Sequence, residues 1–172
     1  MPALVLPDTV YRDSFLAAAE ELRNEGRERA DAFITARTFD RYVERLHRHA
    51  NGDGLPPTWV PYSEYWLTDD AVYLGRVSIR HRLNEKLSRI GGHIGYVIRP
   101  TARRKGYGTL ILRLALPIAQ SVGIVRALLT CDEDNIASRK IIEANGGVYE
   151  ASVEQGNGLP DKRRYWIDLA NA

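Results

Sequence analysis

The chain has a single cysteine, Cys131, among its 172 residues. One thiol cannot form an intrachain disulfide, and a zinc site built from cysteines is equally excluded. We expect no metal ion at the functional site. A chain without a disulfide framework fits a reducing compartment, so we expect the protein to be cytoplasmic.

Long hydrophobic runs and a large excess of one charge are also lacking. The longest apolar run, residues 110–119, is broken by Arg113 and Pro117, and residues 1–6 do not have the pattern of an export signal. We therefore expect no membrane partner. The 24 basic residues nearly balance the 22 acidic ones, and a net charge of +2 argues against a protein built to coat nucleic acid.

Basic residues are nevertheless concentrated in one part of the chain. Between residues 76 and 105 they outnumber a single acid, Glu85. They are Arg76, Arg80, Arg82, Lys86, Arg89, Arg99, Arg103, Arg104 and Lys105. This local imbalance predicts that something anionic docks in this region.

The length fits one domain with a sizeable core, over residues 1–172. We divide it into a helical part, about 1–57, and a part with the sheet, the cofactor motifs and the C-terminal strands, 58–172. Apolar residues at helical spacing predict a first helix between Asp8 and Gly26 and a second between Thr38 and Asn51.

The second part alternates strands and helices, which indicates an α/β fold. A hairpin is predicted first, then a βαβ unit whose two strands pair in parallel, with Pro117 expected to kink or end its helix. A third helix and two strands complete the chain. The predicted strands are 62–67, 72–79, 93–98, 125–130, 148–153 and 164–169, and the third helix is 136–145. An exposed final strand could pair across a homodimer.

The hexapeptide Arg103-Arg104-Lys105-Gly106-Tyr107-Gly108 follows a strand and opens a helix. Backbone amides converge where a helix begins, glycines allow close approach, and cations favour phosphate, so this segment predicts an anion cradle. A phosphorylated cofactor is the first hypothesis. The alternative is an ordinary basic turn at the start of a helix.

Two motifs that are separated in the sequence together resemble those of one known family. Gly95-Tyr96-Val97-Ile98-Arg99-Pro100 and Arg103-x-x-Gly106-x-Gly108 are followed by Asp134-Asn135-x-x-Ser138 and then by Gly146-Gly147. Over about residues 60–169 the chain resembles the GNAT superfamily of acyl-CoA-dependent N-acetyltransferases. The resemblance implies a mixed, splayed β-sheet flanked by helices, acetyl-CoA as cofactor, and direct attack of a primary amine on the acetyl group.

The resemblance also implies which residues hold the cofactor. The turn would hold the pyrophosphate, the strand with Val97 and Ile98 would pair with the pantetheine arm, and Asn135 and Ser138 would lie along that arm. The turn residues are Arg103, Arg104, Lys105, Gly106, Tyr107, Gly108 and Thr109. On capping preference alone, Asn135 is equally well explained as the N-cap of its helix, and both roles can coexist.

The usual general acid of the family, a tyrosine seven residues after the asparagine, is replaced here by Ile142. The departing thiolate could take its proton from Ser138, Cys131 or Tyr149, or from solvent, since a thiol with a pKa near 8.5 leaves tolerably well unaided. Cys131 is better explained as a small buried residue than as a nucleophile.

His93 is the candidate general base. It opens the strand that should lead to the acetyl group, and its titration range suits the removal of a proton from an amine. The alternative is a histidine at a strand edge that is bonded to backbone. Glu85, Asp132 and Glu133 are the reserve candidates.

Two other functions compete with the transferase. A catalytically silent acyl-CoA-binding sensor or interaction module would explain the missing tyrosine, and a nucleic-acid binder would use the basic region, although the near-neutral total charge argues against it. The acceptor is left open as a small-molecule or peptide amine. The aromatic residues around Trp66 and Trp166 are better explained as core than as an acceptor pocket.

Overall fold

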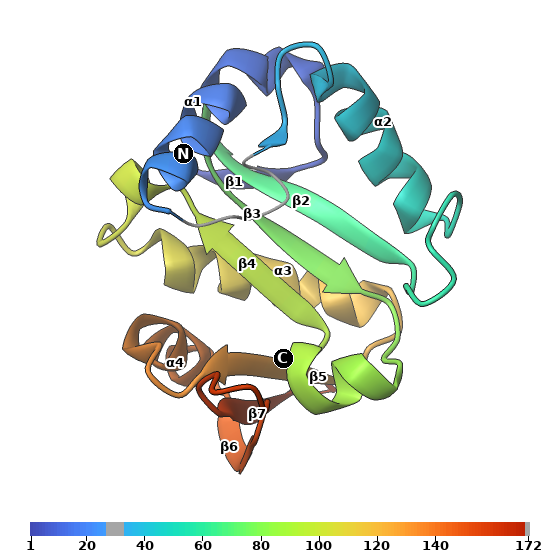
Figure 1. The fold of residues 1–172 in the computed structure, drawn as a ribbon, viewed down its shortest axis with the longest axis vertical. Coiled ribbons are helices and arrows are strands. Elements are labelled where there is room, and N and C mark those ends of the chain that lie inside the picture. The colour runs from blue at the N-terminus through green and yellow to red at the C-terminus, as the bar shows by residue number, and fades with distance from the viewer. Residues whose placement is uncertain (27–32, 171–172) are drawn as a thin grey trace.

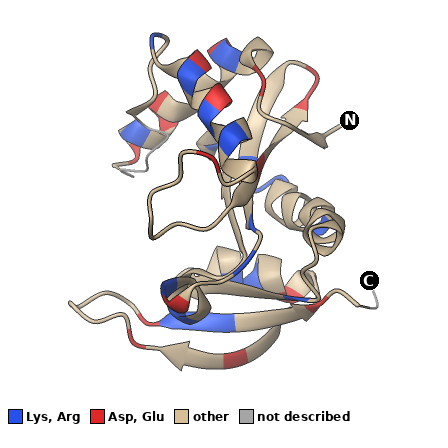
Figure 2. Cartoon of the chain, turned by 90° about the vertical axis from the view of Figure 1, so that its right-hand side faces the viewer, with Lys and Arg blue, Asp and Glu red and all other residues tan. Residues whose placement is uncertain are grey.

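The structure is a computed structural model that describes residues 1–26 and 33–170. Its strands form two antiparallel sheets, which lie in different layers of the molecule (Figures 1 and 2). The first has the order β1 (Ala3–Val5), β2 (Tyr62–Asp69), β3 (Val72–Arg80), β4 (Ile94–Ile98). The second has the order β5 (Arg126–Asp132), β7 (Lys162–Asp168), β6 (Val148–Val153).

The two helices predicted for the N-terminal part are present, and they pack on the first sheet. They are α1 (Arg12–Asn24) and α2 (Phe39–Ala50), and α1 is preceded by the short helix η1 (Thr9–Tyr11). Phe15 and Phe39 bring the apolar faces of α1 and α2 against Trp66 of β2 and Tyr73 of β3, and all four side chains are buried. The helical part also contains a strand that was not predicted, β1, which pairs with the C-terminal half of β2.

Two further helices belong to the second part: α3 (Tyr107–Ser121) and α4 (Ile136–Ala144). Pro117 does not end α3, which continues to Ser121. The last turns are held by a buried stripe at helical spacing that includes Ile111, Ala115 and Ala119, so packing outweighs the lost backbone hydrogen bond. None of the helices in the described residues is long and apolar enough to cross a membrane.

The larger core lies between α3 and the inner faces of both sheets. Ile79 of β3, Ile111 of α3, Leu129 of β5 and Tyr165 of β7 belong to this one cluster and are at most 1% exposed. Burial of such side chains stabilises the fold by about 1.5–3 kcal/mol each. The two sheets therefore share one core, which confirms the expected splayed α/β architecture.

The strands β4 and β5 run in broadly the same direction and are linked through α3, but they do not form the predicted parallel ladder. They meet at one place, just before β4 begins. There the amide of His93 donates to the carbonyl of Leu128 at 2.7 Å, and the amide of Leu128 donates to Nδ1 of His93 at 2.9 Å. From this junction β4 and β5 diverge toward their carboxyl ends (Figure 1).

The sheet order also corrects the expectation for the last strand. Because β7 lies between β5 and β6, it is the central strand of its sheet and offers no free edge for a partner. The outer strands are β5 and β6 in the second sheet and β1 and β4 in the first. A dimer through the final strand is therefore excluded by topology, and β4 is the open edge beside the divergence of the sheets.

The junction gives the first testable prediction. The change His93→Leu should lower the free energy of unfolding by about 1–3 kcal/mol, because the buried amide of Leu128 loses its acceptor. The control His93→Asn should lose less than half as much, since its side-chain oxygen can take the place of Nδ1. Urea unfolding measures both, and equal losses would contradict the role given to this hydrogen bond.

The same histidine should also make stability depend on pH. Burial lowers the pKa of His93 from its ordinary value of 6.5, and the charge of Arg80 acts in the same direction. The folded state then takes up a proton less readily than the unfolded chain, so its stability is full above pH 6.5 and falls as the pH drops through 6.5 toward the folded-state pKa. Burial lowers the pKa of His49 and His81 as well. His93→Asn should therefore reduce the loss of stability between about pH 7 and 5 without abolishing it.

Candidate functional site

The predicted anion cradle lies at the start of α3, next to the open edge of β4. Gly106 is the N-cap residue of α3 and has a φ of 82°, a left-handed conformation that suits glycine. No side chain of the described residues caps this helix, and its first turn contains no acid. The first amides of a helix have no partner within it. The start of α3 therefore presents free N–H groups, as a phosphate site requires.

The three cations of the turn divide into two kinds. Arg103 is turned back toward the fold: its NH1 is 2.8 Å from Glu25 of α1, and its Nε donates to the carbonyl of Ile98 at 3.2 Å. Arg104 and Lys105 are exposed. Arg103 thus positions the turn, while Arg104 and Lys105 remain available to a ligand.

Gly108 is required for a reason that the sequence did not suggest. A Cβ at this position would lie 2.4 Å from Cδ1 of Ile141 in α4. The glycine therefore allows α3 and α4 to pack closely at this point. That it also leaves room for a ligand stays a prediction. The neighbouring residues Tyr107 and Thr109 form the rest of this first turn, and the carbonyl of Thr109 accepts from Asn145 at 3.3 Å.

The edge of β4 faces the diverging space, and none of the strands in the described residues pairs with it on that side. Val97 pairs with Arg76 of β3, and Val97 and Ile98 are both half-buried. An unpaired strand edge can accept an extended ligand by main-chain hydrogen bonds. The carbonyl of Ile98 is already used by Arg103, which limits what Ile98 can offer.

The start of α4 lies at the end of β5, as predicted. Asn135 is the N-cap residue, and its side-chain oxygen accepts from the amide of Ser138 at 3.0 Å. The capping role of Asn135 is therefore confirmed. Ser138 is met by a residue from the other sheet: its Oγ lies 2.9 Å from the hydroxyl of Tyr96 in β4. Burial raises the pKa of Tyr96 to about 12, so its phenol keeps its proton at neutral pH.

The other acid candidates lie elsewhere or are poorly suited. Cys131 is buried, as expected, and burial raises the pKa of its thiol. Tyr149 is exposed on β6, and its hydroxyl is 3.1 Å from Ser152. Ile142, at the position where the resemblance implies a tyrosine, is 1% exposed and belongs to the core.

The candidate bases are also separated. The Nδ1 atom of His93 already accepts from Leu128, so the geometry favours the structural alternative for this histidine. Asp132 accepts from Lys162 at 2.6 Å, and Glu133 is exposed, 4.0 Å from Arg163. Of the candidates, only Glu85 lines a large groove on the face of the first sheet.

This groove, of about 1370 Å³, lies between α2, the face of β2 and β3 beside it, and the short helix η3 (Leu87–Gly91), drawn in green in Figure 1. Glu64, 5% exposed, stands in its wall. Its carboxylate accepts four hydrogen bonds, from Tyr42, Trp66, Arg76 and Ser78, at 3.1–3.3 Å. Because this carboxylate already accepts four hydrogen bonds, Glu64 stabilises the wall of the groove and is not suited to act as a general base.

The groove reaches the junction of the two sheets. The carbonyl of Ile90, in its lower wall, accepts from the hydroxyl of Thr130 in β5 at 3.0 Å. Arg80, also in the wall, donates to the carbonyls of Gly91 and Gly92, immediately before His93. The groove therefore ends beside the point from which β4 and β5 diverge.

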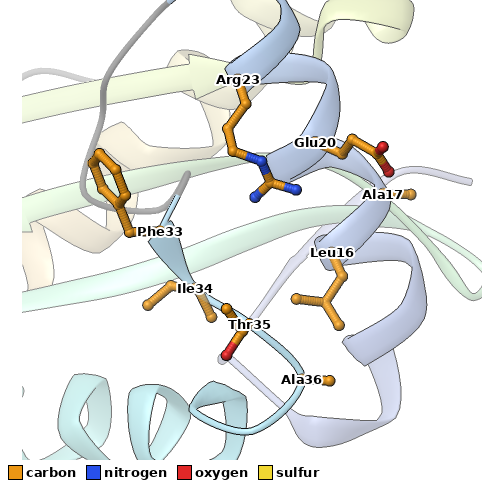
Figure 3. A pocket seen from close by; sticks show the side chains of 8 residues that line it. All are labelled: Leu16, Ala17, Glu20, Arg23, Phe33, Ile34, Thr35 and Ala36. Atoms are coloured by element: carbon orange, nitrogen blue, oxygen red, sulfur yellow. The ribbon is translucent and has the colours of Figure 1, made fainter.

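A second hollow, of about 610 Å³, lies between α1 and the segment before α2. In Figure 3 the side chain of Arg23 on α1 extends toward this segment, which includes Phe33 and Ile34, whereas the side chain of Glu20 points away from it. None of the predicted site residues lines this hollow. The described residues contain no group of histidine, cysteine and acidic side chains that could hold a metal ion.

Sequence reasoning missed Tyr96 and Glu64 as parts of the site, and it named Arg80 only as one of the residues of the basic region. Tyr96 stands within a motif in which only the backbone was expected to act. The alternation of side chains along the strands could have indicated Glu64 and Arg80. Glu64 lies between aromatic residues in β2, and Arg76, Ser78 and Arg80 lie on one face of β3. These are polar positions on a sheet face that a helix should cover. That pattern marks a polar groove under a helix.

Solved structures of similar fold are acetyltransferases. The ribosomal alpha-N-protein acetyltransferase RimL, in complex with coenzyme A, matches with a TM-score of 0.74 and 16% identity, covering 99% of this chain and 96% of RimL. The microcin self-immunity acetyltransferase MccE, in complex with acetyl-CoA and AMP, has a TM-score of 0.72 and 16% identity, covering 97% and 92%. A SpeG spermidine N-acetyltransferase chimera from Vibrio cholerae and hSSAT has a TM-score of 0.67 and 17% identity, covering 99% and 96%.

At such identities the likeness shows the fold alone, and no curated protein matches the sequence. The family model for the acetyltransferase (GNAT) domain, however, matches residues 13–148, which is most of the chain. This match includes both sheet edges of the junction, the start of α3 and the start of α4. The chain belongs to the GNAT family of acetyltransferases.

Proposed function

We propose that this enzyme transfers an acetyl group from acetyl-CoA to a primary amine by direct attack. The observation that carries the proposal is the uncapped start of α3 beside the open edge of β4. Free amides suit the pyrophosphate and a free strand edge suits the pantetheine arm, so the two features together fit one extended ligand. Family membership supports the same donor.

In this proposal each part of coenzyme A has its own partners. The amides of Tyr107, Gly108 and Thr109, with the side chains of Arg104 and Lys105, hold the pyrophosphate. The edge of β4 at Val97 and Ile98 pairs with the pantetheine arm. The capping hydrogen bond uses only the side-chain oxygen of Asn135. Its side-chain amide nitrogen is therefore free to donate to the same arm.

The chemical step needs a neutral amine at the thioester carbon. Its nitrogen forms the new C–N bond, the carbonyl oxygen becomes an oxyanion stabilised by a backbone amide near Val97, and the C–S bond then breaks to release coenzyme A. The amine proton leaves through the groove, where Glu85 is the one predicted base that lines the wall. Orientation of the two substrates supplies much of the rate.

We propose that Ser138 and Tyr96 together stabilise the sulfur of coenzyme A as it leaves. A phenol with a pKa of about 12 is a weaker acid than a thiol, whose pKa is about 8.5. Complete proton transfer from Tyr96 to the thiolate would therefore be uphill. We infer that Ser138 donates a hydrogen bond to the sulfur and that Tyr96 donates to Ser138, so the pair stabilises the thiolate without ionising.

The first test of the function is binding and turnover of acetyl-CoA. A ligand at about 100 times its Kd stabilises the fold by about 2.7 kcal/mol, which for a chain of this size raises Tm by about 5–10 °C. Release of free thiol with a panel of amines measures turnover. Stabilisation without turnover on any amine would favour the silent acyl-CoA-binding module, and no stabilisation at millimolar acetyl-CoA would remove the basis of the proposal.

A second prediction separates helix packing from ligand contact at Gly108. The change Gly108→Val should weaken coenzyme A binding more than Arg104→Ala, because its side chain collides with Ile141 and displaces the start of α3, whereas one exposed cation contributes about 0–1 kcal/mol. The double variant Gly108→Val/Ile141→Ala should regain part of the affinity. If calorimetry shows no recovery, the space at Gly108 serves the ligand directly.

A third prediction concerns the pair at the sulfur. Tyr96→Phe should lower kcat about 2- to 10-fold, which corresponds to one hydrogen bond, with little change in acetyl-CoA affinity. Ser138→Ala should lower kcat more. If the two act as one unit, the double variant should be no slower than Ser138→Ala alone. Fully multiplicative losses would mean that Tyr96 and Ser138 act independently.

A further inference from the structure

The charge of the groove has no role in the proposed binding of acetyl-CoA. Five basic side chains line it against two acidic ones. The basic residues are Arg45, Arg76, Arg80, Arg82 and Lys86, and the acidic residues are Glu64 and Glu85. Four of the five basic residues, all but Arg45, come from the part of the sequence where basic residues are concentrated. The groove is separate from the cofactor turn at Arg104.

One of the acidic residues is already neutralised within the wall. Glu64 forms an ion pair with Arg76 at 3.3 Å, and its remaining hydrogen-bonding capacity is taken by neutral donors. The other acid, Glu85, is exposed at the rim. The groove therefore keeps a positive field from Arg45, Arg80, Arg82 and Lys86.

Arg80 is the groove cation that lies at the junction of the two sheets. Its NH1 donates to the carbonyls of Gly91 and Gly92 at 3.3 and 3.0 Å, and none of the acidic side chains in the described residues forms an ion pair with it. Burial, together with the charge of Arg76, lowers the pKa of Arg80. A half-buried guanidinium held only by carbonyls would be stabilised by an anion.

The position of Arg80 connects the groove to β4. A Cβ on Gly95 of β4 would lie 3.7 Å from NH1 and 3.8 Å from NH2 of Arg80, so the guanidinium lies over the backbone at the start of that strand. The acetyl group is proposed to sit along the same strand. A group bound by Arg80 would therefore lie at the start of the strand along which the acetyl group is proposed to sit.

We propose that the acceptor is an amine that carries carboxylate or phosphate groups close to its nitrogen, and that Arg80 binds the nearest of these anions, with Arg82 and Arg45 at the rim. This inference rests on the proposed acetyl transfer and names its substrate class. Polyamines are disfavoured because their further ammonium groups would face the same four cations. A groove of about 1370 Å³ exceeds the usual size of a small-molecule site, so it can also hold an acidic peptide N-terminus.

The test compares acceptors that differ only in charge. Three amidated peptides, Ala-Glu-Asp-Gly, Ala-Gln-Asn-Gly and Ala-Lys-Lys-Gly, are assayed with acetyl-CoA beside O-phosphoserine, serine amide and spermidine. We expect kcat/KM for the acidic peptide or for O-phosphoserine to exceed that of its neutral counterpart at least 10-fold, with a gap that narrows as salt increases. The peptide arm shows whether carboxylates alone are enough, and O-phosphoserine, which carries both a carboxylate and a phosphate, shows whether a phosphate increases the preference further.

Variants identify the groove as the origin of the preference. Arg80→Gln, which can still donate to a carbonyl, should lower kcat/KM for the acidic acceptor about 10-fold more than it lowers kcat/KM for the neutral acceptor. Arg82→Glu reduces the positive charge of the groove at an exposed position, where the substitution should not disturb folding. It should lower the preference for the acidic acceptor in the same way. The matched control is Arg41→Glu, an exposed arginine one turn before Arg45 on α2 that does not line the groove.

A binding measurement makes the inference independent of turnover. The N-acetylated forms of the three peptides are titrated by calorimetry, and the acidic product should bind at least 10-fold more tightly than the neutral one. Equal affinities, or a preference for the lysine peptide or spermidine while acetyl-CoA still binds and is consumed, would overturn the inference and leave the acetyltransferase intact. Failure of acetyl-CoA to bind or react would instead overturn the proposed function, and the acceptor class with it.

Discussion

The contact between His93 and Leu128 is the constraint on which the arrangement of the molecule depends. Two hydrogen bonds join the sheets at the start of β4, and no ladder continues from them. Because the strands separate from that point, β4 keeps a free edge, and α3 and α4 both begin at the open end (Figure 1). A histidine suits this position because Nδ1 of its ring accepts the hydrogen bond from the amide of Leu128, which no main-chain carbonyl of β4 accepts here. The same bond explains why His93 is a poor choice for a general base.

The division of labour between the two faces follows from that geometry. The open end supplies backbone groups, which suit a cofactor whose shape is fixed. The groove on the other face is built from side chains on α2, β3 and η3, which can vary without disturbing the junction. Glu64 shows how such a groove is made rigid: a buried carboxylate with four donors holds two strands and a helix in register. Arg80 lies where the two faces meet.

The features that could be predicted from the sequence are local or repeated. The helices and most strands follow from periodicity, and the start of α3 follows from a glycine turn with cations. The predictions that failed depend on contacts between distant residues. The strand β1 forms only because it pairs with β2, and Pro117 stays within α3 because the buried face of that helix packs in the core. The contact between Tyr96 and Ser138 joins residues 42 positions apart in the sequence. Arg103 belonged to the motif, yet its side chain is used by Glu25 of α1, which no spacing rule indicates.

The central claim is that the diverging strands and the uncapped start of α3 form one cofactor site. The most direct measurement is a crystal structure of the protein with coenzyme A. The account predicts the pyrophosphate against the amides of Tyr107–Thr109, the pantetheine arm along the edge of β4 at Val97, and the thiol beside Ser138. Coenzyme A bound in the groove of Arg80, or at the start of α3 with its arm directed away from β4, would contradict it.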